Sequence, residues 1–331
     1  MKILVTGVTG RVGRNLSAAL LARGDTVRGL VLPGDPGLGS AQAAGIECLV
    51  GNLRDAEVGA EAVAGVDAIF HLGAMMLWGD FEQNAVLFED NVRGTFNLLN
   101  AAAARATDLK RFVFASSDEV YPSLSAEYLP IDEDHPTKPY SFYGTSKLIG
   151  ENLAFYYHRA ISLPATVARF ALVTEPPEVT RPDGWLGRFL FVESMIGTAR
   201  AIGGTEAAAT LEGLQVDPKT LLLARDAGGT PYMFHYCDVR DLVQGLLLLL
   251  DHPDAVGEAF NLSGPVPFTY DLAIPYLSEK SGIPFVEVNI PGPPIRIQHS
   301  IAKAQTVLGY RPQYDFHGTV DAALAAGDVK R

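Results

Sequence analysis

The sequence predicts a doubly wound α/β fold with a parallel central sheet, together with a second, smaller lobe. Short apolar runs of strand length alternate with helical patterns through the first half of the chain, as in successive βαβ units. The chain also opens on such a run, which leads through a glycine turn directly into a helix. Beyond Val173 the alternation breaks down and proline and glycine become frequent, which indicates a separate lobe.

The predicted strands of the sheet follow one another in chain order. They cover Lys2–Thr6, Thr26–Leu32, Ile46–Val50, Asp67–Leu72, Arg111–Ala115, Ala165–Val173 and Ala259–Leu262. Between them, apolar residues at helical spacing predict helices, including a long one over Leu87–Ala104 and another over Tyr143–Tyr157. Right-handed crossovers place the carboxyl ends of parallel strands, among them Thr6, Leu72 and Ser117, along one edge, where ligands bind.

The glycine turn is the first candidate functional element. It covers Gly7–Gly13 with the spacing G-x-x-G-x-x-G, between the first strand and a helical pattern. Glycine lets the backbone turn sharply and approach a pyrophosphate closely, and the helix presents free N–H groups to that anion. The turn therefore predicts a dinucleotide site in a Rossmann-type sheet, with a plain βα connection as the alternative.

The predicted lobes are both discontinuous in sequence. Residues 1–173 and 233–262 are expected to form the NAD(P)-binding Rossmann domain. Residues 174–232 and 263–331 are expected to form a smaller discontinuous substrate-binding lobe that covers the ligand edge of the sheet.

Composition excludes several classes of partner. A chain of 331 residues with 48% hydrophobic and 19% charged residues is globular, and its net charge of −12, without a basic run, argues against nucleic acid and anionic membrane. The longest apolar run, Leu246–Leu250, is too short to span a bilayer. Cys48, Cys237 and the seven histidines lack metal-ligand spacing. We therefore expect a soluble, cytoplasmic protein with reduced, buried thiols and no metal.

Tyr143 and Lys147 form the most informative pair of polar residues. They stand four apart on a predicted helix, so their side chains leave the same face one turn apart. An ammonium beside a phenol favours the phenolate, which would lower the pKa of Tyr143 and suit it to general acid/base work. Ser117, at the end of a predicted strand, could hydrogen-bond the substrate oxygen whose proton Tyr143 handles. An exposed helix surface is the alternative for the pair taken alone.

Several short motifs occur in the order in which one enzyme family carries them. They are Thr6-Gly-x-x-Gly-x-x-Gly13, Asn52-Leu-Arg-Asp55, Phe70-His-Leu-Gly-Ala74, Asn91-Val-x-Gly-Thr95, Phe112-Val-Phe-Ala-Ser-Ser117, Tyr143-Gly-Thr-Ser-Lys147, Asp238-Val-Arg-Asp241 and Leu308-Gly-Tyr-Arg-Pro312. As a set, over nearly the whole chain, they resemble the extended short-chain dehydrogenases/reductases of the NAD-dependent epimerase/dehydratase family. The set is specific for the family and much less so for the substrate.

The resemblance implies a nicotinamide cofactor, NAD or NADP, and a catalytic triad of Ser117, Tyr143 and Lys147. Tyr143 would take the proton of a substrate hydroxyl as hydride is transferred, and Lys147 would also hold the nicotinamide ribose. Besides Tyr143 and Lys147, the implied cofactor contacts are Gly7, Gly10, Arg11, Val12, Gly13, Asn52, Leu53, Leu72, Gly73, Ala74 and Asn91. For Asn91, a role in stabilising its helix is an equal alternative. The resemblance also implies a homodimer formed through the helices that follow Asn91 and Tyr143.

The choice between NAD and NADP depends on the end of the second strand. An acidic residue there typically binds the adenosine ribose of NAD, whereas an arginine accommodates NADP. Val31-Leu32-Pro33 offers neither, and Leu32 replaces the arginine that is usual in NADP-binding relatives, which favours NAD. Arg11, within the glycine turn, could approach a 2′-phosphate or could be exposed to solvent.

Three further residues are candidates for substrate binding. The segment Arg169–Pro176 keeps the arginine of the R-x-x-N-V-Y-G-P stretch of nucleotide-sugar relatives but loses its Asn, Tyr and Gly, so a nucleotide handle on the substrate is in doubt. Asp118 and Glu119 resemble the acid and base of dTDP-glucose 4,6-dehydratases, with two solvated carboxylates as the alternative.

These observations predict hydride transfer to or from a secondary hydroxyl of a sugar or sugar-derived substrate. One alternative is a nucleotide-sugar 4,6-dehydratase that uses Asp118 and Glu119. Another is a non-catalytic dinucleotide-binding regulator, which would have no need for Tyr143 and Lys147 beside Ser117.

Overall fold

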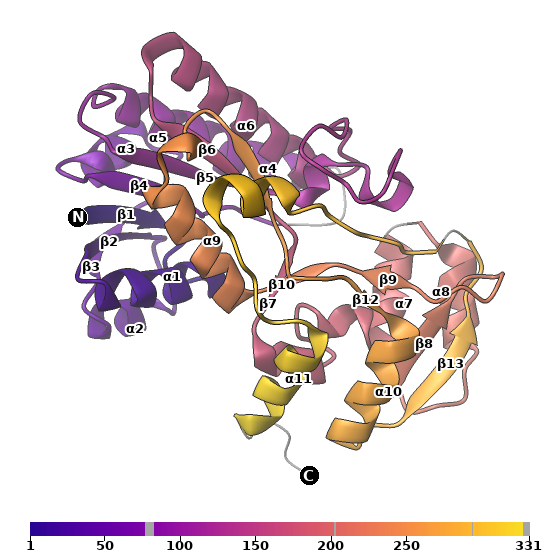
Figure 1. The fold of residues 1–331 in the computed structure, drawn as a ribbon. Coiled ribbons are helices and arrows are strands. Elements are labelled where there is room, and N and C mark those ends of the chain that lie inside the picture. Colours follow the sequence, from indigo (N-terminus) through magenta and orange to yellow (C-terminus); the bar gives the residue numbers. More distant parts are fainter. Residues whose placement is uncertain (77–82, 202, 293, 327–331) are drawn as a thin grey trace.

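The computed structural model describes residues 1–76, 83–201, 203–292 and 294–326 (Figure 1). Within these residues the central sheet has seven strands, all parallel, in the order β11-β6-β5-β4-β1-β2-β3. The strands are β1 (Lys2–Thr6), β2 (Thr26–Val31), β3 (Glu47–Val50), β4 (Ala68–His71), β5 (Arg111–Ser117), β6 (Ala165–Phe170) and β11 (Ala259–Leu262). The predicted doubly wound parallel sheet is confirmed.

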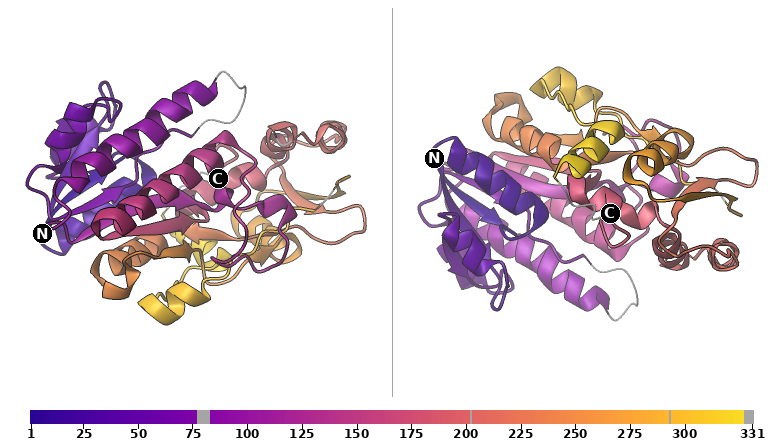
Figure 2. Two further views of the ribbon diagram at one scale, coloured as in Figure 1. Left: turned by 90° about the horizontal axis from the view of Figure 1, so that it is seen from above. Right: turned by 90° about the horizontal axis from the view of Figure 1, so that it is seen from below.

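Helices cover both faces of this sheet (Figures 1 and 2). On one face lie α3 (Ala56–Val63), α5 (Gly94–Ala103) and α6 (Phe142–Ile161), and on the other lie α1 (Arg11–Ala22), α2 (Leu38–Ala43) and α9 (Val239–Asp251). Leu98 and Ala154 pack with the strand residue Phe112 on the first face, and Leu16 and Leu246 pack with Phe70 on the second. The side chains of the inner strands β1, β4, β5 and β6 are largely buried on both faces, which explains why these strands are mostly apolar in sequence.

Two predicted elements differ from those in the structure. The helix expected over Leu87–Ala104 is composite, with α4 (Asn84–Leu87), a π-helical stretch η2 (Phe88–Arg93) and then α5. The strand expected over Ala165–Val173 divides at Ala171, whose N–H bonds the carbonyl of Leu262. Beyond that residue, β7 (Leu172–Thr174) leaves the central sheet and pairs with β10 (Tyr236–Asp238).

A second cluster of buried apolar side chains forms beside the sheet. It is built on β8 (Leu221–Arg225), which pairs in parallel with β13 (Phe285–Asn289), and on the antiparallel pair β9 (Met233–Phe234) and β12 (Phe268–Thr269). The helices around it are α7 (Val192–Ala201), α8 (Thr205–Glu212), α10 (Tyr270–Ser281) and α11 (Phe316–Ala325). Figure 1 shows this group of elements to one side of the sheet.

The two apolar clusters differ from the predicted lobes in two places. Phe234 and Tyr236, predicted in the large lobe, pack in the second cluster. Ile301, Leu308 and Tyr310 pack in the core of the large lobe, beside α9, although the predicted boundary at residue 263 assigns them to the smaller lobe. The lobe boundaries themselves stay a prediction. Cys48 and Cys237 are both free thiols; Cys237 is buried as expected, whereas Cys48, on the edge strand β3, is partly exposed. No helix in the described part of the chain is long and apolar enough to cross a membrane.

Candidate active site

The glycine turn joins the centre of the sheet to the start of α1. Gly7 has a φ of +67°, and a Cβ on Gly13 would lie 2.1 Å from the carbonyl oxygen of Gly7, so the turn closes on itself only with glycine at these positions. A Cβ on Gly10 would instead meet that oxygen at 3.3 Å and nothing nearer. No side chain of the described residues caps α1, and its first turn carries no acidic residue. These features fit a dinucleotide pyrophosphate.

A buried hydrogen-bond chain fixes the end of β1 against the end of β4. The N–H of Gly73 donates to Oγ1 of Thr6 at 2.9 Å, and the Thr6 hydroxyl hydrogen-bonds Nδ1 of His71 at 2.8 Å. Nε2 of His71 hydrogen-bonds Oγ1 of Thr95 at 2.8 Å. Burial, with the charge of Lys147 adding to it, lowers the pKa of His71 to about 3, so this histidine is a neutral structural residue. Gly73 is thereby held beside the glycine turn, as the predicted cofactor wall at Leu72–Ala74 requires.

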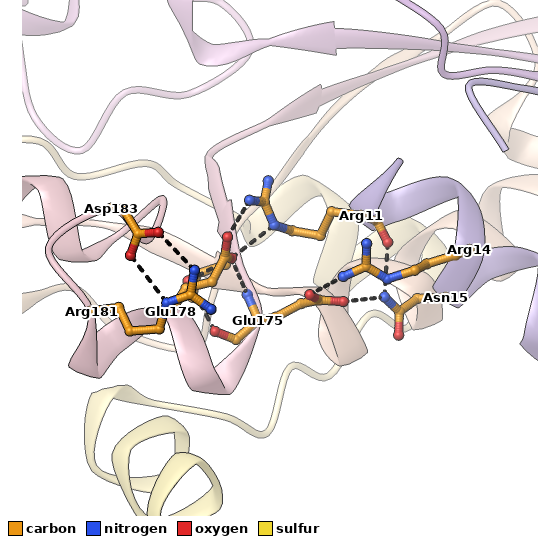
Figure 3. A network of polar contacts seen from close by, with 8 residues as sticks. Arg11, Arg14, Asn15, Glu175, Glu178, Arg181 and Asp183 are labelled. Carbon is orange, nitrogen blue, oxygen red and sulfur yellow. Dashed lines mark hydrogen bonds and ion pairs between the residues drawn. The ribbon is translucent and has the colours of Figure 1, made fainter. Parts of the chain in front are cut away.

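Arg11 reaches from the glycine turn to the smaller lobe, as Figure 3 shows. Its guanidinium forms a two-bond ion pair with Glu178, in which Nε lies 2.8 Å from Oε2. Glu178 stands in a short helix, η5 (Pro176–Thr180), which follows β7. One turn further along α1, Arg14 pairs with Glu175, and Asn15 Nδ2 donates to Oε1 of the same carboxylate at 2.7 Å. The Arg11 side chain is therefore engaged by protein carboxylate and is not left to solvent.

Ser117, Tyr143 and Lys147 meet at the carboxyl edge of the sheet. Ser117 ends β5, and Tyr143 and Lys147 lie one turn apart near the start of α6. All three are buried, with 8%, 8% and 4% of their surface exposed. Nζ of Lys147 donates to the carbonyl of Ala115 at 2.8 Å and lies 5.7 Å from the centre of the Tyr143 ring. The Ser117 hydroxyl acts on the pKa of the Tyr143 phenol, which it lowers. The structure thus assembles the predicted triad.

The electrostatic state of Tyr143 differs from the prediction. Burial raises the pKa of its phenol well above the ordinary value of 10.0, and the carboxylates of Glu119 and Asp118 raise it further, while the Ser117 hydrogen bond opposes them. The predicted lowering of this pKa by Lys147 is therefore wrong for this structure. The physical reason is that the phenol is buried beside two carboxylates, whereas the Lys147 ammonium is directed at a backbone carbonyl.

The start of α6 depends on Glu119. Ser141 is the N-cap of the helix, with its Oγ accepting the N–H of Gly144 at 2.8 Å, and its hydroxyl donates to Oε2 of Glu119 at 2.5 Å. A Cβ on Gly144 would lie 2.3 Å from the carbonyl oxygen of Glu119, so the residue after Tyr143 must be glycine for α6 to approach this closely. Glu119 thereby helps to fix the position of Tyr143.

A buried ion pair lies behind Lys147. Nε and Nη2 of Arg169 donate to the two carboxylate oxygens of Glu151 at 3.0 and 2.8 Å, and Nη1 donates to the hydroxyl of Tyr121 at 2.7 Å. Ser116 Oγ donates to Glu151 at 2.5 Å. Burial lowers the pKa of Lys147 to about 8, and the Glu151 carboxylate opposes that shift. Arg169 thus holds β5, β6 and α6 together, and its predicted substrate contact stays a prediction.

The remaining predicted cofactor residues lie around the same edge. Asn91 bonds both backbone groups of Met75, at 2.7 and 2.8 Å, and donates to Oγ of Ser146 at 3.0 Å. It therefore braces the segment after β4 against α6, and a direct cofactor contact stays a prediction. Leu53 is buried after β3, and the Asn52 side chain accepts the N–H of residue 54 at 2.9 Å.

Sequence reasoning missed three functional candidates. Asp35, four residues beyond β2, accepts the Thr9 hydroxyl at 2.8 Å, which brings a carboxylate to the glycine turn. Glu151 stands one turn beyond Lys147 on α6, a spacing that could have identified it as a partner. Nε2 of His299 lies 3.6 Å from Oδ2 of Asp118. The two residues are so far apart in sequence that no motif could indicate this contact.

A Rossmann-type sheet in which a glycine turn and a buried Ser-Tyr-Lys group share one edge defines a short-chain dehydrogenase/reductase. The chain belongs to the NAD-dependent epimerase/dehydratase family, whose model matches residues 3–193. The predicted family is therefore confirmed.

Named relatives of the chain differ in their reactions. It is 30% identical over 293 residues to a 4-hydroxy-2-methyl-3-oxo-4-farnesyl-3,4-dihydroquinoline-1-oxide ketoreductase of Stigmatella aurantiaca, covering 88% of this chain and 76% of the relative. It is 33% identical over 204 residues to a uronate dehydrogenase of Agrobacterium fabrum, covering 60% of this chain and 72% of the relative. A crystal structure of a short-chain dehydrogenase/reductase superfamily protein from Agrobacterium tumefaciens with bound NAD superposes with a TM-score of 0.89 at 36% identity, covering 99% of this chain and 97% of that one.

Proposed function

We propose that this protein is an NAD-dependent oxidoreductase that transfers hydride to or from a secondary hydroxyl of a sugar or sugar-derived substrate. The observation that carries the proposal is the meeting of Ser117, Tyr143 and Lys147, all buried, at the sheet edge that also carries the glycine turn. A protein that only bound a dinucleotide would not need a buried phenol and ammonium at that edge. The family and the NAD-bound structural relative support the same assignment.

Each residue of the triad has a distinct task in this proposal. The Ser117 hydroxyl holds the substrate oxygen, and Tyr143 exchanges a proton with that oxygen. Lys147, positioned by the Ala115 carbonyl and by the charge of Glu151, supplies positive charge beside the phenol and a donor for the cofactor ribose. A bound nicotinamide supplies the hydride acceptor or donor. The raised pKa of Tyr143 keeps the phenol protonated at neutral pH, the form that donates a proton in the direction of carbonyl reduction.

The proposed preference for NAD rests on two side chains near the glycine turn. Asp35 brings a carboxylate to the region after β2, where a carboxylate favours the 2′-hydroxyl of NAD and repels the 2′-phosphate of NADP. Arg11, the cation that could have met that phosphate, is paired with Glu178. Titration of the purified protein with NAD and with NADP, side by side, tests this preference.

Turnover on a panel of free sugars tests the proposed function. The purified protein is incubated with NAD and with aldoses, uronates and polyols, and reduced cofactor is followed by absorbance while the product is identified by NMR. We expect NAD reduction with at least one member of the panel and a carbonyl at the carbon that carried the hydroxyl. Cofactor binding without turnover of any member would favour the non-catalytic regulator.

The dehydratase alternative depends on Glu119 acting as a base. Its carboxylate accepts the Ser141 hydroxyl at 2.5 Å, and a glutamine oxygen can accept the same bond. We therefore expect Glu119→Gln to leave turnover nearly unchanged when the true substrate is assayed. In a dehydratase, loss of the base would slow elimination by about 10²–10⁴-fold while reduced cofactor still formed. That second result would show that the enzyme catalyses an elimination and not the proposed reaction.

We also propose a homodimer formed through α5 and α6, which lie side by side on one face of the sheet (Figure 2). Phe96 on α5 and Tyr156 on α6 are 44% and 57% exposed, an unusual position for large aromatic side chains. We expect light scattering at micromolar concentration to give a dimer, and the double variant Phe96→Glu, Tyr156→Glu to give a monomer. Leu272→Glu, at a residue that is 69% exposed on α10, is the control and should remain dimeric. A monomeric parent protein would refute the proposal.

A further inference from the structure

His299 is a buried polar side chain whose ring nitrogens are left without hydrogen bonds within the described part of the chain. It is 4% exposed, and neither Nδ1 nor Nε2 has a hydrogen-bond partner among the residues that the structure describes. A buried imidazole of this kind costs free energy, about 1–3 kcal/mol for each unsatisfied group. Native proteins pair such groups unless a site requires them to stay open.

The neighbours of His299 hold its ring at the triad. Its backbone N–H donates to Nδ1 of His235 at 3.1 Å, and the two rings stack with their centres 5.8 Å apart. His235 in turn bonds the carbonyl of Gly264 through Nε2 at 3.1 Å, so both of its nitrogens are satisfied. On its other side, Nε2 of His299 lies 3.6 Å from Oδ2 of Asp118, which is too long for a hydrogen bond.

Asp118 connects this histidine to the catalytic residues. Its Oδ1 accepts the Ser117 hydroxyl at 3.2 Å, and its charge acts on the phenol of Tyr143. Asp118 therefore lies between Ser117, which it bonds directly, and His299, which stands 3.6 Å away. A substrate oxygen held by Ser117 has the Asp118–His299 pair next to it.

The charge states of His299 and Asp118 indicate which chemical group of a ligand this pair binds. Burial, with His235 beside it, lowers the pKa of His299 to about 3, so the ring is neutral and offers one donor and one acceptor. Burial and the Glu119 carboxylate raise the pKa of Asp118 to about 7, so it offers a carboxylate or a carboxylic acid. A hydroxyl group, which both donates and accepts, matches these partners. An anionic carboxylate or phosphate would meet no cation in the pair.

We propose that His299 and Asp118 bind a second hydroxyl of the substrate, on the carbon next to the one that Tyr143 and Ser117 address. The substrate class is then a neutral polyol or sugar with a vicinal diol at the reacting position, and His299 is a specificity-determining residue. This inference rests on the proposed function, because it requires the triad to act on a hydroxyl.

Matched sugar pairs test the inference through kcat/KM. L-Arabinose and 2-deoxy-L-ribose differ by one hydroxyl at C2, as do D-glucose and 2-deoxy-D-glucose. We expect His299→Leu to lower kcat/KM for the parent sugar by about 10–100-fold, the effect of one lost hydrogen bond to a buried partner. Turnover of the deoxy analogue should stay unchanged. His299→Gln, which retains an amide donor, should recover part of the activity, and the exposed His317→Leu is the control.

NMR of protein labelled with nitrogen-15 histidine supplies a readout that does not depend on turnover. With NAD present, we expect the parent sugar to shift the His299 imidazole nitrogens and the deoxy analogue to leave them in place. The thermal midpoint of His299→Leu should equal or exceed that of the parent protein, because two unsatisfied polar atoms are removed. This inference alone is overturned if sugars are turned over and His299→Leu leaves the ratio of kcat/KM between parent and deoxy sugar unchanged. It is also overturned if sugars are turned over and the parent sugar does not shift the His299 nitrogens. No turnover of any sugar overturns both it and the proposed function.

Discussion

Tyr143→Phe is expected to reduce turnover by about 10²–10⁴-fold while leaving NAD binding and the thermal midpoint close to those of the parent protein. The substitution removes one phenolic oxygen and keeps the ring, so the packing of α6 against the sheet is preserved. The oxygen that is lost is the one that exchanges the substrate proton in the proposed reaction. Steady-state rates, cofactor titration and a melting curve on the same preparation check the three parts of this expectation.

The pH dependence of the parent enzyme adds a second check on Tyr143. As a base in hydroxyl oxidation, the phenol must lose its proton, and burial together with two carboxylates raises its pKa. The oxidation rate should therefore rise with pH well into the alkaline range, whereas carbonyl reduction should fall over the same range. Tyr143→Phe should lose that dependence. A Tyr143→Phe variant that binds NAD and turns over at near the parent rate would show that the catalytic assignment is wrong.

Gly10→Val should lower the affinity for NAD by at least about 100-fold, equivalent to about 2.7 kcal/mol. The backbone at Gly10 has a φ of −74° and a ψ of 170°, an extended conformation that valine adopts readily. A Cβ there would meet the carbonyl oxygen of Gly7 at 3.3 Å, a tight contact that a small shift relieves, so the protein should still fold. The added methyl groups then occupy the space over the start of α1, where the pyrophosphate is expected. Calorimetric titration of the folded variant measures the loss.

The choice of Gly10 keeps this test separate from a folding defect. At Gly13 a Cβ would lie 2.1 Å from the Gly7 carbonyl oxygen, so a substitution there would disturb the turn itself. Gly197→Val, on α7 of the smaller lobe, is the matched control, because a Cβ at that position meets nothing within 4 Å. Unchanged NAD affinity in a folded Gly10→Val protein would refute the glycine-turn assignment.

The fold could be predicted from sequence because its signals are local. Strands such as Lys2–Thr6 are buried on both faces and are therefore apolar throughout, and the glycine turn marks the first βα junction. The strand predicted over Ala165–Val173 is divided at Ala171, and this division could not be predicted in the same way. Beyond Ala171 the chain pairs with β10 and no longer with the central sheet, and no local pattern encodes a partner so distant in sequence.

The candidate site shows the same contrast between local and distant information. The pairing of Tyr143 with Lys147 follows from helical spacing, and Ser117 follows from its place at a strand end. The ion pair of Arg169 with Glu151 depends on the packing of β6 against α6, which the motif does not encode. The motif alone therefore indicated only a substrate contact. The pKa of Tyr143 was mispredicted because burial and the carboxylates of residues 118 and 119 are properties of the assembled fold.

The ion pairs of Figure 3 bear on how the two lobes could be inherited or exchanged. Arg11 and Arg14 stand at the start of the nucleotide-binding half, yet their acidic partners, Glu178 and Glu175, follow its last central βαβ unit by a few residues. A recombinant that joined residues 1–173 to the smaller lobe of another protein would lose both carboxylates at once. Two cations beside the glycine turn would then have to find new partners. An exchange of the smaller lobe must therefore retain Glu175 and Glu178, so that the half with the glycine turn keeps its counter-charges.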